Sequence, residues 1–302
     1  MTSEAAVPAV QFRALTRRFG RNVAVREMDL AIPPGGVIAL VGRNGAGKTT
    51  AVKMLLGLLR PTSGDVKVLG LDPIRDRLQL RLRSGYVPDK TSLYPWMKVT
   101  DVLELASALH PRWESSYAAR LVDILGLPVD RKVKALSRGE LAQLSFVIAA
   151  APKPELLVLD EPTSGLDPIV RHALLEALRD LASDRSRTIL FSTHVMPDVD
   201  GVAERAIIVD GGRILAEGSV DALKARHVKA SILFDEPPDG ARSVPGARRV
   251  TRGLREWIAI FDSSQRPDTE AIARELGAKD VRFVPLTFDE VFLEMVAPAE
   301  RA

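Results

Sequence analysis

A loop with the spacing of a phosphate-binding motif occupies residues 42–49, with the sequence Gly-Arg-Asn-Gly-Ala-Gly-Lys-Thr. Its glycines let the backbone turn tightly enough for successive N–H groups to point inward at phosphate oxygens. Lys48 can reach the β and γ phosphates of a nucleotide as a point charge, and the Thr49 hydroxyl is placed to bind Mg²⁺. A bare glycine-rich turn is the alternative, but all fixed positions of the motif are present, which favours nucleotide binding. The residues expected to bind the nucleotide here are Gly42, Asn44, Gly45, Ala46, Gly47, Lys48, Thr49 and Thr50.

Two adjacent carboxylates, Asp160 and Glu161, follow the apolar run at residues 156–159. The carboxyl ends of strands are where open α/β sheets bind their ligands. Because adjacent residues of a strand point in opposite directions, we expect Asp160 to hold Mg²⁺ through water, while Glu161 polarises an attacking water as the general base. Two solvated acids at a strand end are the alternative; the phosphate loop earlier in the chain favours the catalytic interpretation.

The apolar runs around these residues predict an α/β fold built on a P-loop NTPase core. A strand at 37–41 leads into the loop, and a helix at 50–59 follows it. Further strands are expected at 156–159, 188–191 and 206–209, with a helix at 168–181. Alternation of this kind favours a mainly parallel sheet with helices on both faces.

Other segments of the chain have a different periodicity. Residues 10–32 alternate apolar and polar positions around a turn at 20–22, which predicts an antiparallel β subdomain of two or three strands. Between 100 and 126 the apolar residues recur at helical spacing, which predicts a helical insert at about 90–150.

The last part of the chain is predicted to form a small α+β domain of its own. After about Lys229, prolines and glycines predict a loop region. A strand at 257–261, a helix at 269–276 and a strand at 281–284 are expected to follow it. A final helix is expected to begin at Thr287, which forms a capping-box pattern with Glu290. The predicted domains are therefore 1–228 and 229–302.

Bulk composition narrows the class of protein. The 42 basic and 39 acidic residues give a formal charge of +3, too small to indicate a nucleic-acid partner. The absence of cysteine excludes disulfides and agrees with a reducing cytoplasm. No secretory signal pattern is expected at residues 1–10, and no apolar run approaches the roughly 20 residues of a membrane span, so we expect any membrane role to come through a partner.

The order of motifs over residues 10–226 resembles the ATP-binding subunits of ABC transporters. Besides the phosphate loop and the Asp160-Glu161 pair, the resemblance rests on Leu-Ser-Arg-Gly-Glu at 136–140 as the signature, Ser-Gly-Leu-Asp at 164–167 as the D-loop, and His194 as the switch histidine. The resemblance implies ATP and Mg²⁺ as cofactors. It also implies two protomers packed head to tail, with each ATP held between the phosphate loop of one and the signature of the other.

Residue roles follow from this resemblance. Ser137 and Gly139 would contact the γ-phosphate bound to the partner protomer, and Asp167 would act across the dimer interface. Ser137 also occupies the N-cap of a predicted helix, whose N-terminus would present N–H groups to phosphate. Phe19 would stack on adenine and Val25 would line the ribose, although both would look the same as plain core residues of the sheet. The catalytic residues are expected to be Glu161, His194 and Lys48.

Three positions depart from the family pattern. Arg138 replaces a glycine and Glu140 a glutamine of the usual signature. Asp89 stands where the family usually has a glutamine that senses Mg²⁺ and the membrane partner. Two interpretations of Asp89 are open: it accepts a hydrogen bond from a metal-bound water, or it is a solvated loop residue.

The resemblance implies ATP hydrolysis coupled to transport through a separate polytopic permease. Apolar residues at 93–97 are expected to dock this partner, and residues 287–293 resemble the exporter-type (ABC-2-like) subfamily. The expected assembly is a homodimer, or a dimer with a related ATPase subunit, held on the cytoplasmic face of the membrane. Two alternatives are a soluble ABC-type ATPase that acts on ribosomes or DNA, and a regulatory subunit that hydrolyses ATP weakly.

Overall fold

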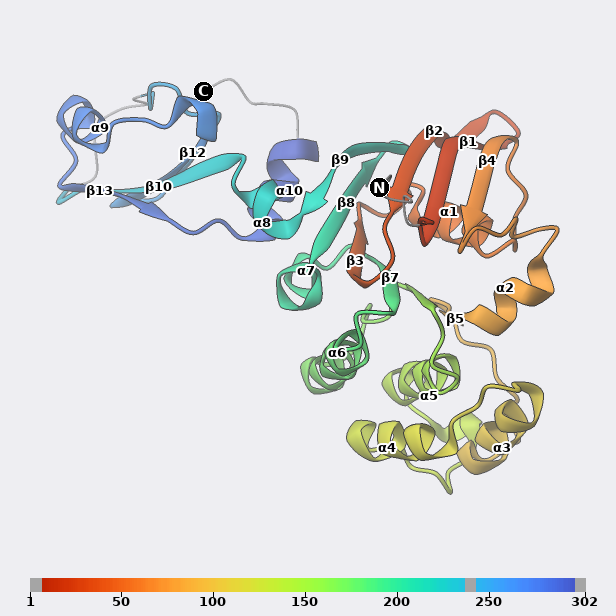
Figure 1. Cartoon of the computed structure of the whole chain (residues 1–302). Coiled ribbons are helices and arrows are strands. Elements are labelled where there is room, and N and C mark those ends of the chain that lie inside the picture. Colours follow the sequence, from red (N-terminus) through yellow and green to blue (C-terminus); the bar gives the residue numbers. More distant parts are fainter. Residues whose placement is uncertain (1–6, 237–242, 297–302) are drawn as a thin grey trace, which may run out of the picture. The chain divides into compact units, whose positions relative to one another are not determined.

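The computed structural model describes residues 7–236 and 243–296, and divides the chain into two compact units, Met1–Ala216 and Glu217–Ala302 (Figure 1). The second unit begins before the domain boundary that the sequence predicts at 228/229. The prolines at 237 and 238 and the glycine at 240, which belong to the predicted loop region, lie outside the described residues. Within the described residues, no helix is both long and apolar enough to cross a membrane.

The first unit is organised around a six-stranded sheet with the order β5-β6-β7-β3-β8-β9. The pairs β5/β6, β6/β7, β7/β3 and β3/β8 are parallel, as the predicted alternation requires. The six strands are β3 (Gly36–Val41), β5 (Ser84–Val87), β6 (Leu156–Asp160), β7 (Thr188–Thr193), β8 (Arg205–Asp210) and β9 (Arg213–Ser219).

A second, three-stranded sheet has the order β2-β1-β4, with β1 (Val10–Phe19) antiparallel to both β2 (Asn22–Ile32) and β4 (Ser63–Val68). Helix α1 (Lys48–Leu55) shares one hydrophobic core with both sheets. Buried members of this core include Phe12 and Leu15 of β1, Val52 and Leu55 of α1, and Leu40, Val158 and Leu190 of the parallel sheet. This core fixes the start of α1 against the ends of the central strands.

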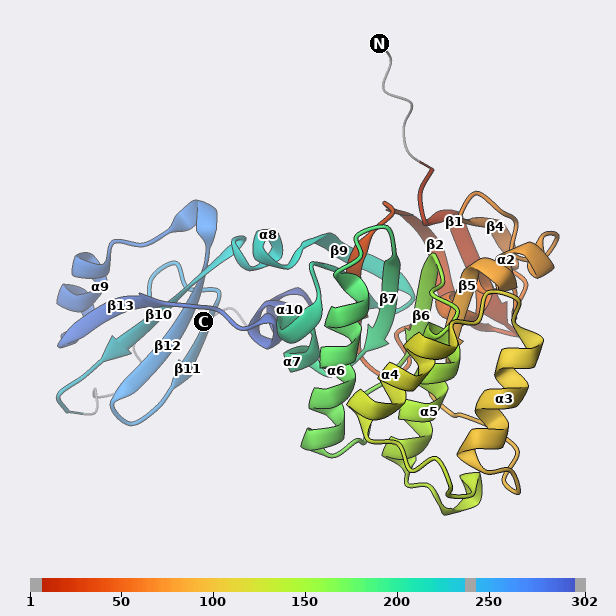
Figure 2. The same ribbon diagram turned by 60° about the horizontal axis from the view of Figure 1, so that its bottom comes forward.

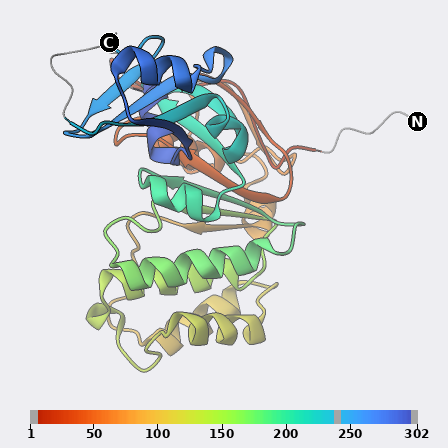
Figure 3. The ribbon, with the colours of Figure 1, turned by 90° about the vertical axis from the view of Figure 1, so that its left-hand side faces the viewer.

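Helices occupy another side of the parallel sheet. Helices α3 (Val99–Leu109) and α4 (Ser115–Leu125) pack on α5 (Arg138–Ala150), and α5 contacts both β5 and α6 (Pro168–Ala182) (Figures 2 and 3). The remaining helices of this unit are α2 (Arg77–Arg83), the 3-10 turn η1 (Val133–Ala135) and α7 (Met196–Val202). The mixed α/β class, the antiparallel subdomain and the helical insert are thus confirmed.

One predicted helix was too long. The helix expected at 50–59 runs as α1 from Lys48 to Leu55, because the chain turns at Gly57 with φ 68°. A Cβ at Gly57 would lie 2.1 Å from the carbonyl oxygen of Pro73, so the chain packs too closely there for any other residue.

The second unit has a four-stranded antiparallel sheet with the order β11-β12-β10-β13. Its core joins Ile232, Trp257 and Phe261 of the sheet to Ile272 and Leu276 of α9. The capping box predicted at Thr287 is present, because Glu290 accepts from the Thr287 N–H at 2.9 Å. The elements are α8 (Val220–Lys224), β10 (His227–Leu233), β11 (Arg249–Arg252), β12 (Glu256–Asp262), η2 (Ser263–Gln265), α9 (Thr269–Leu276), β13 (Asp280–Val284) and α10 (Phe288–Val296).

Candidate functional site

The phosphate loop connects the buried strand β3 to the first residue of α1, Lys48. Gly47 caps the helix with φ 103°, and a Cβ there would lie 2.4 Å from the carbonyl oxygen of Ala24. Only glycine satisfies both the left-handed backbone and this approach. The Lys48 ammonium is buried and donates to the carbonyl oxygens of Gly42 at 2.6 Å and Arg43 at 3.2 Å. The loop therefore surrounds the Lys48 ammonium, at the place where the phosphate oxygens of a nucleotide would bind.

The carboxylate of Asp160 lies against the start of α1. Its Oδ1 atom accepts hydrogen bonds from the Thr49 hydroxyl at 3.1 Å and the Ser192 hydroxyl at 2.5 Å. Burial raises the pKa of Asp160, and these two hydrogen bonds oppose the rise. A hydroxyl and a carboxylate side by side are the hard oxygen donors that Mg²⁺ prefers, with nucleotide phosphates supplying further ligands. Thr49 and Asp160 therefore fit the predicted metal site.

Glu161 is oriented by a turn rather than by strand alternation. Strand β6 ends at Asp160, and Glu161 follows in the left-handed region with φ 53°. Its N–H donates to the carbonyl and hydroxyl oxygens of Ser192 at 3.1 and 3.0 Å. Glu161 thus lies just outside the strand, and the positive φ, rather than the alternation of strand residues that we expected, sets the direction of its side chain.

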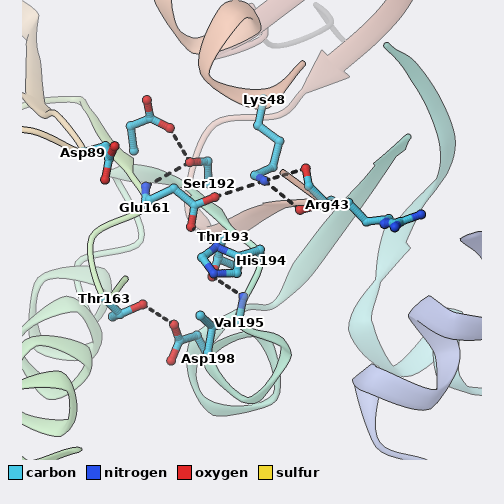
Figure 4. Close-up of polar contacts among 12 residues, drawn as sticks. Arg43, Lys48, Asp89, Glu161, Thr163, Ser192, Thr193, His194, Val195 and Asp198 are labelled. Carbon is cyan, nitrogen blue, oxygen red and sulfur yellow. Dashed lines mark hydrogen bonds and ion pairs between the residues drawn. The ribbon is translucent and has the colours of Figure 1, made fainter. Parts of the chain in front are cut away.

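The Glu161 carboxylate sits between two cationic or protonatable side chains (Figure 4). Lys48 Nζ lies 3.0 Å from Oε1, and His194 Nδ1 lies 2.7 Å from Oε2. The structure thus brings together the three residues predicted to be catalytic, drawn from α1, the turn after β6 and the end of β7. A base held by an imidazole and near a phosphate-binding lysine can accept a proton from a water at a phosphoryl group.

A cavity of about 380 Å³ opens at this cluster. Phe19 at its rim is half-exposed, and the Arg17 guanidinium lies 4.6 Å from the centre of its ring. Val25 is fully buried, so Asn22 and Ala24 line the cavity in its place, and a ribose contact from Val25 has no exposed side-chain surface here. The cavity is lined by Phe19, Asn22, Ala24, Arg43, Asn44, Gly45, Ala46, Gly47, Lys48, Thr49, Thr50, Asp89 and Glu161.

The signature lies at the N-terminus of α5. Ser137 caps the helix by accepting from the Glu140 N–H at 3.1 Å, and Glu140 accepts in return from the Ser137 N–H at 2.7 Å. The hydrogen bond from the Ser137 N–H lowers the pKa of Glu140, and Arg131 lowers it further. Gly139 is held close to α6, since a Cβ there would lie 3.0 Å from Val170 Cγ1. The predicted capping box is confirmed, and in it Glu140 pairs with Ser137 at the start of α5.

Asp167 caps α6 by accepting from the N–H groups of Ile169 and Val170 at 3.0 and 3.1 Å. Among the residues that the structure describes, the cavity around the phosphate loop is lined by none of Ser137, Gly139 and Asp167. Within the described part of one copy, the phosphate-loop cavity is therefore built without Ser137, Gly139 and Asp167.

Two of the departures from the family pattern meet in space. Arg138 Nη2 lies 3.8 Å from Asp89 Oδ1, and both side chains line a second cavity of about 420 Å³ that Glu161 and Ser164 also reach. The same guanidinium covers Gly165 of the D-loop, where an added Cβ would lie 2.6 Å from Nη1. Sequence reasoning treated Asp89 and Arg138 as separate changes, because 49 positions divide them and no local pattern connects them.

Asp198 is a buried charge that sequence reasoning missed. It lies on α7, four positions after His194, and none of its surface is exposed. Its carboxylate accepts from the Thr163 hydroxyl and from Arg171 Nε at 2.6 Å. The sequence signal that could have identified Asp198 is its position on the helix that follows His194, a residue expected at the site.

The comparisons with known proteins agree with this geometry. A family model described as "ABC transporter" matches residues 25–164. A "Nod factor export ATP-binding protein I" of Cupriavidus metallidurans is 37% identical over 299 residues, covering 95% of this chain and 96% of the relative. The chain belongs to the family of ABC transporter ATP-binding proteins. It is therefore an ATP-binding ATPase subunit, and the resemblance drawn from the motifs is confirmed.

More distant relatives extend the comparison. An "ABC transporter ATP-binding protein YtrB" of Bacillus subtilis is 25% identical over 284 residues and covers 94% of this chain and 97% of the relative. A solved "ATP binding subunit of ABC transporter" superposes with a TM-score of 0.64 at 27% identity, covering 72% of this chain and 92% of its own. A dimeric ATP-binding cassette bound to ADP and Pi shares the fold, with a TM-score of 0.61 at 21% identity over 70% of this chain and 98% of its own.

Proposed function

We propose that this chain is the ATP-hydrolysing subunit of an exporter, and that two copies close head to tail around two ATP molecules. The observation that carries the proposal is the division of the site within one copy. The phosphate loop and Glu161 line one cavity, and Asp160 accepts a hydrogen bond from Thr49 of the loop, whereas Ser137 and Gly139 lie at the start of α5 and do not line that cavity. A helix N-terminus with free N–H groups binds anions, so a second copy would complete the phosphate site.

Each residue of the proposed site has a separate role in ATP hydrolysis. The phosphate loop and Lys48 hold the β and γ phosphates, and Thr49 and Asp160 would hold Mg²⁺, which neutralises charge on the phosphate oxygens when bound. Glu161 accepts the proton of the attacking water, and His194 keeps the Glu161 carboxylate in place through their 2.7 Å contact. Binding of ATP between two copies stabilises the dimer, and hydrolysis releases it.

Glu161→Gln tests the composite site. The amide keeps the shape of the side chain but cannot accept the proton, so this variant should turn over far more slowly and accumulate as an ATP-bound dimer in size-exclusion chromatography with light scattering. Lys48→Ala is the matched control, because loss of the phosphate contact should prevent both ATP binding and dimer formation. Wild-type turnover by Glu161→Gln would show that the base is assigned wrongly.

Export through a membrane-spanning partner is supported by the names of the relatives and by an exposed aromatic pair. Tyr94 and Trp96 are exposed, and their ring centres lie 5.3 Å apart. Backbone bonds from Lys134 to Pro95 at 3.1 Å and from Val133 to Met97 at 2.9 Å hold this turn against η1. Exposed aromatic residues on a fixed turn suit a protein interface. The partner would place the subunit on the cytoplasmic face of the membrane.

Trp96→Asp tests this docking surface. The substitution should abolish copurification with the membrane-spanning partner, while ATP affinity stays unchanged. Leu109→Asp is the matched control, since Leu109 is also exposed but lies at the end of α3. Unchanged copurification of the Trp96 variant would refute the assignment of the 93–97 segment.

A further inference from the structure

Glu161 is held in a backbone conformation that a glutamate rarely adopts. At φ 53° its Cβ crowds the following carbonyl group, which is unfavourable for any residue other than glycine. Such a residue keeps its conformation only where its surroundings over-determine it. Ser192 fixes the N–H on the upstream side, and Lys48 and His194 hold the carboxylate. Downstream, the Glu161 carbonyl oxygen accepts from the Ser164 N–H at 3.2 Å, and the side chain of Thr163 provides a second anchor.

Asp198 supplies that anchor through Thr163. The Thr163 hydroxyl, two residues after Glu161, donates to Oδ2 of Asp198, and Arg171 Nε donates to Oδ1. A fully buried carboxylate is expensive unless it is paired and hydrogen-bonded. Both oxygens of Asp198 have a partner, so the carboxylate and the hydroxyl it holds are fixed in one arrangement.

The two contacts form parallel links between the same two segments. His194 and Asp198 belong to the segment that leaves β7, and Glu161 and Thr163 belong to the turn that leaves β6. Figure 4 shows Glu161 beside His194 and, lower in the view, the Thr163–Asp198 contact. Loss of the Thr163–Asp198 contact would free the turn directly after Glu161.

We infer that Asp198 is a positioning residue for ATP hydrolysis: through the Thr163 hydroxyl it keeps Glu161 in its left-handed conformation, with the carboxylate against Lys48 and His194. This inference rests on the assignment of Glu161 as the general base. Arg171 balances the buried charge of Asp198 and does not touch the base in the described structure.

The decisive comparison is Thr163→Val against Thr163→Ser. Valine keeps the shape of threonine without the hydroxyl, and serine keeps the hydroxyl. Thr163→Val should lower kcat by about tenfold or more with an unchanged KM for ATP, because small displacements of catalytic groups cost rate while the phosphate loop is untouched. Thr163→Ser should retain kcat within about twofold. Asp198→Asn keeps the size of the carboxylate and should lower kcat in the same way.

A second pair of residues controls for the loss of a buried ion pair as such. In the C-terminal unit Glu294 pairs with Arg249 at 2.5 Å, with exposed fractions of 4% and 28%, against 0% and 29% for Asp198 and Arg171. Glu294→Gln should lower the Tm and leave kcat per folded molecule unchanged. The Asp198 variant should lower both.

A double mutant separates this inference from the assignment of the base. If Thr163 acts through Glu161, adding Thr163→Val to Glu161→Gln should cause no further loss of the residual turnover. An equal loss in both backgrounds, or wild-type kcat for Thr163→Val, would overturn the inference while leaving Glu161 as the base. Wild-type turnover by Glu161→Gln alone would instead overturn the base assignment on which the inference rests.

Discussion

The ion pair between Arg138 and Asp89 can be tested by a double-mutant cycle. Arg138→Gln and Asp89→Asn each remove one charge and keep most of the side-chain volume, and the double variant removes both. The pair joins the loop after β5 to the first turn of α5. Its interaction free energy therefore measures how firmly these two parts of the proposed site are coupled within one copy.

The geometry predicts a small coupling. At 3.8 Å, two unit charges in water attract by about 1 kcal/mol. The exposed fractions are 61% for the Arg138 side chain and 38% for Asp89, so the water value applies better than an interior one. Measured exposed pairs contribute about 0.2 to 1 kcal/mol. At 1 M salt the screening length falls to about 3 Å, and the attraction should fall to about a quarter of its unscreened value.

Urea unfolding of the four proteins, at low salt and at 1 M NaCl, measures this coupling. The chain has three tryptophans, Trp96, Trp113 and Trp257. A Trp257→Phe background leaves only the two in the first unit, so fluorescence then reports the unfolding of that unit. We expect a coupling of about 0.2 to 1 kcal/mol at low salt and about a quarter of that value at 1 M. A coupling above about 2 kcal/mol, or one that 1 M salt leaves unchanged, would refute the description of a solvent-screened pair.

Three further outcomes are expected. Gly47→Ala should abolish ATP binding, measured by calorimetry, because its Cβ would meet the Ala24 carbonyl; Gly45→Ala, with φ 84° and open space around it, should bind more weakly than wild type but still measurably. Burial raises the pKa of Asp160, so the folded state binds the proton of this carboxyl group more tightly than the unfolded chain does. Above the folded pKa, the ionised carboxylate therefore destabilises the fold. Asp160→Asn should therefore raise the Tm at pH 7, lose this advantage as the pH falls through the folded pKa, and lose Mg²⁺-dependent turnover; a lower Tm at pH 7 would contradict this. Thr287→Ala removes the capping box of α10 and should cost about 1 kcal/mol in urea unfolding followed by circular dichroism, whereas Thr287→Ser should be neutral.

The sequence predicted the elements whose signals are local. Spacing alone identified the phosphate loop, the capping boxes at Ser137 and Thr287, and helix α9 at 269–276. Each depends on residues at most seven positions apart, so the chemistry of the residues is enough. Short elements such as α2 and α7 were missed, because seven residues carry too few apolar positions to establish a helical period.

The remaining features of the site depend on contacts between distant parts of the chain. The left-handed turn at Glu161 is stabilised by Ser192, from another strand, which accepts its N–H. Asp198 could not be recognised as buried without knowing that Thr163 and Arg171 surround it. Hydrophobic periodicity describes which face of an element is buried, and it does not describe which polar groups are buried together.

The pairing of Arg138 with Asp89 changes what these two departures imply for hydrolysis. Taken singly, an extra cation at the signature and an extra carboxylate near the metal site would each disturb the charge around the nucleotide, which is the basis of the weakly hydrolysing alternative. As a pair they add no net charge, and Arg138 offsets the carboxylate of Asp89 beside the cavity that Glu161 also lines. The negative charge of Asp89 also contributes to the raised pKa of Asp160, so a cation near Asp89 favours the ionised form of Asp160 that Mg²⁺ needs. The pair therefore supports an active ATPase, in which one change of charge compensates the other.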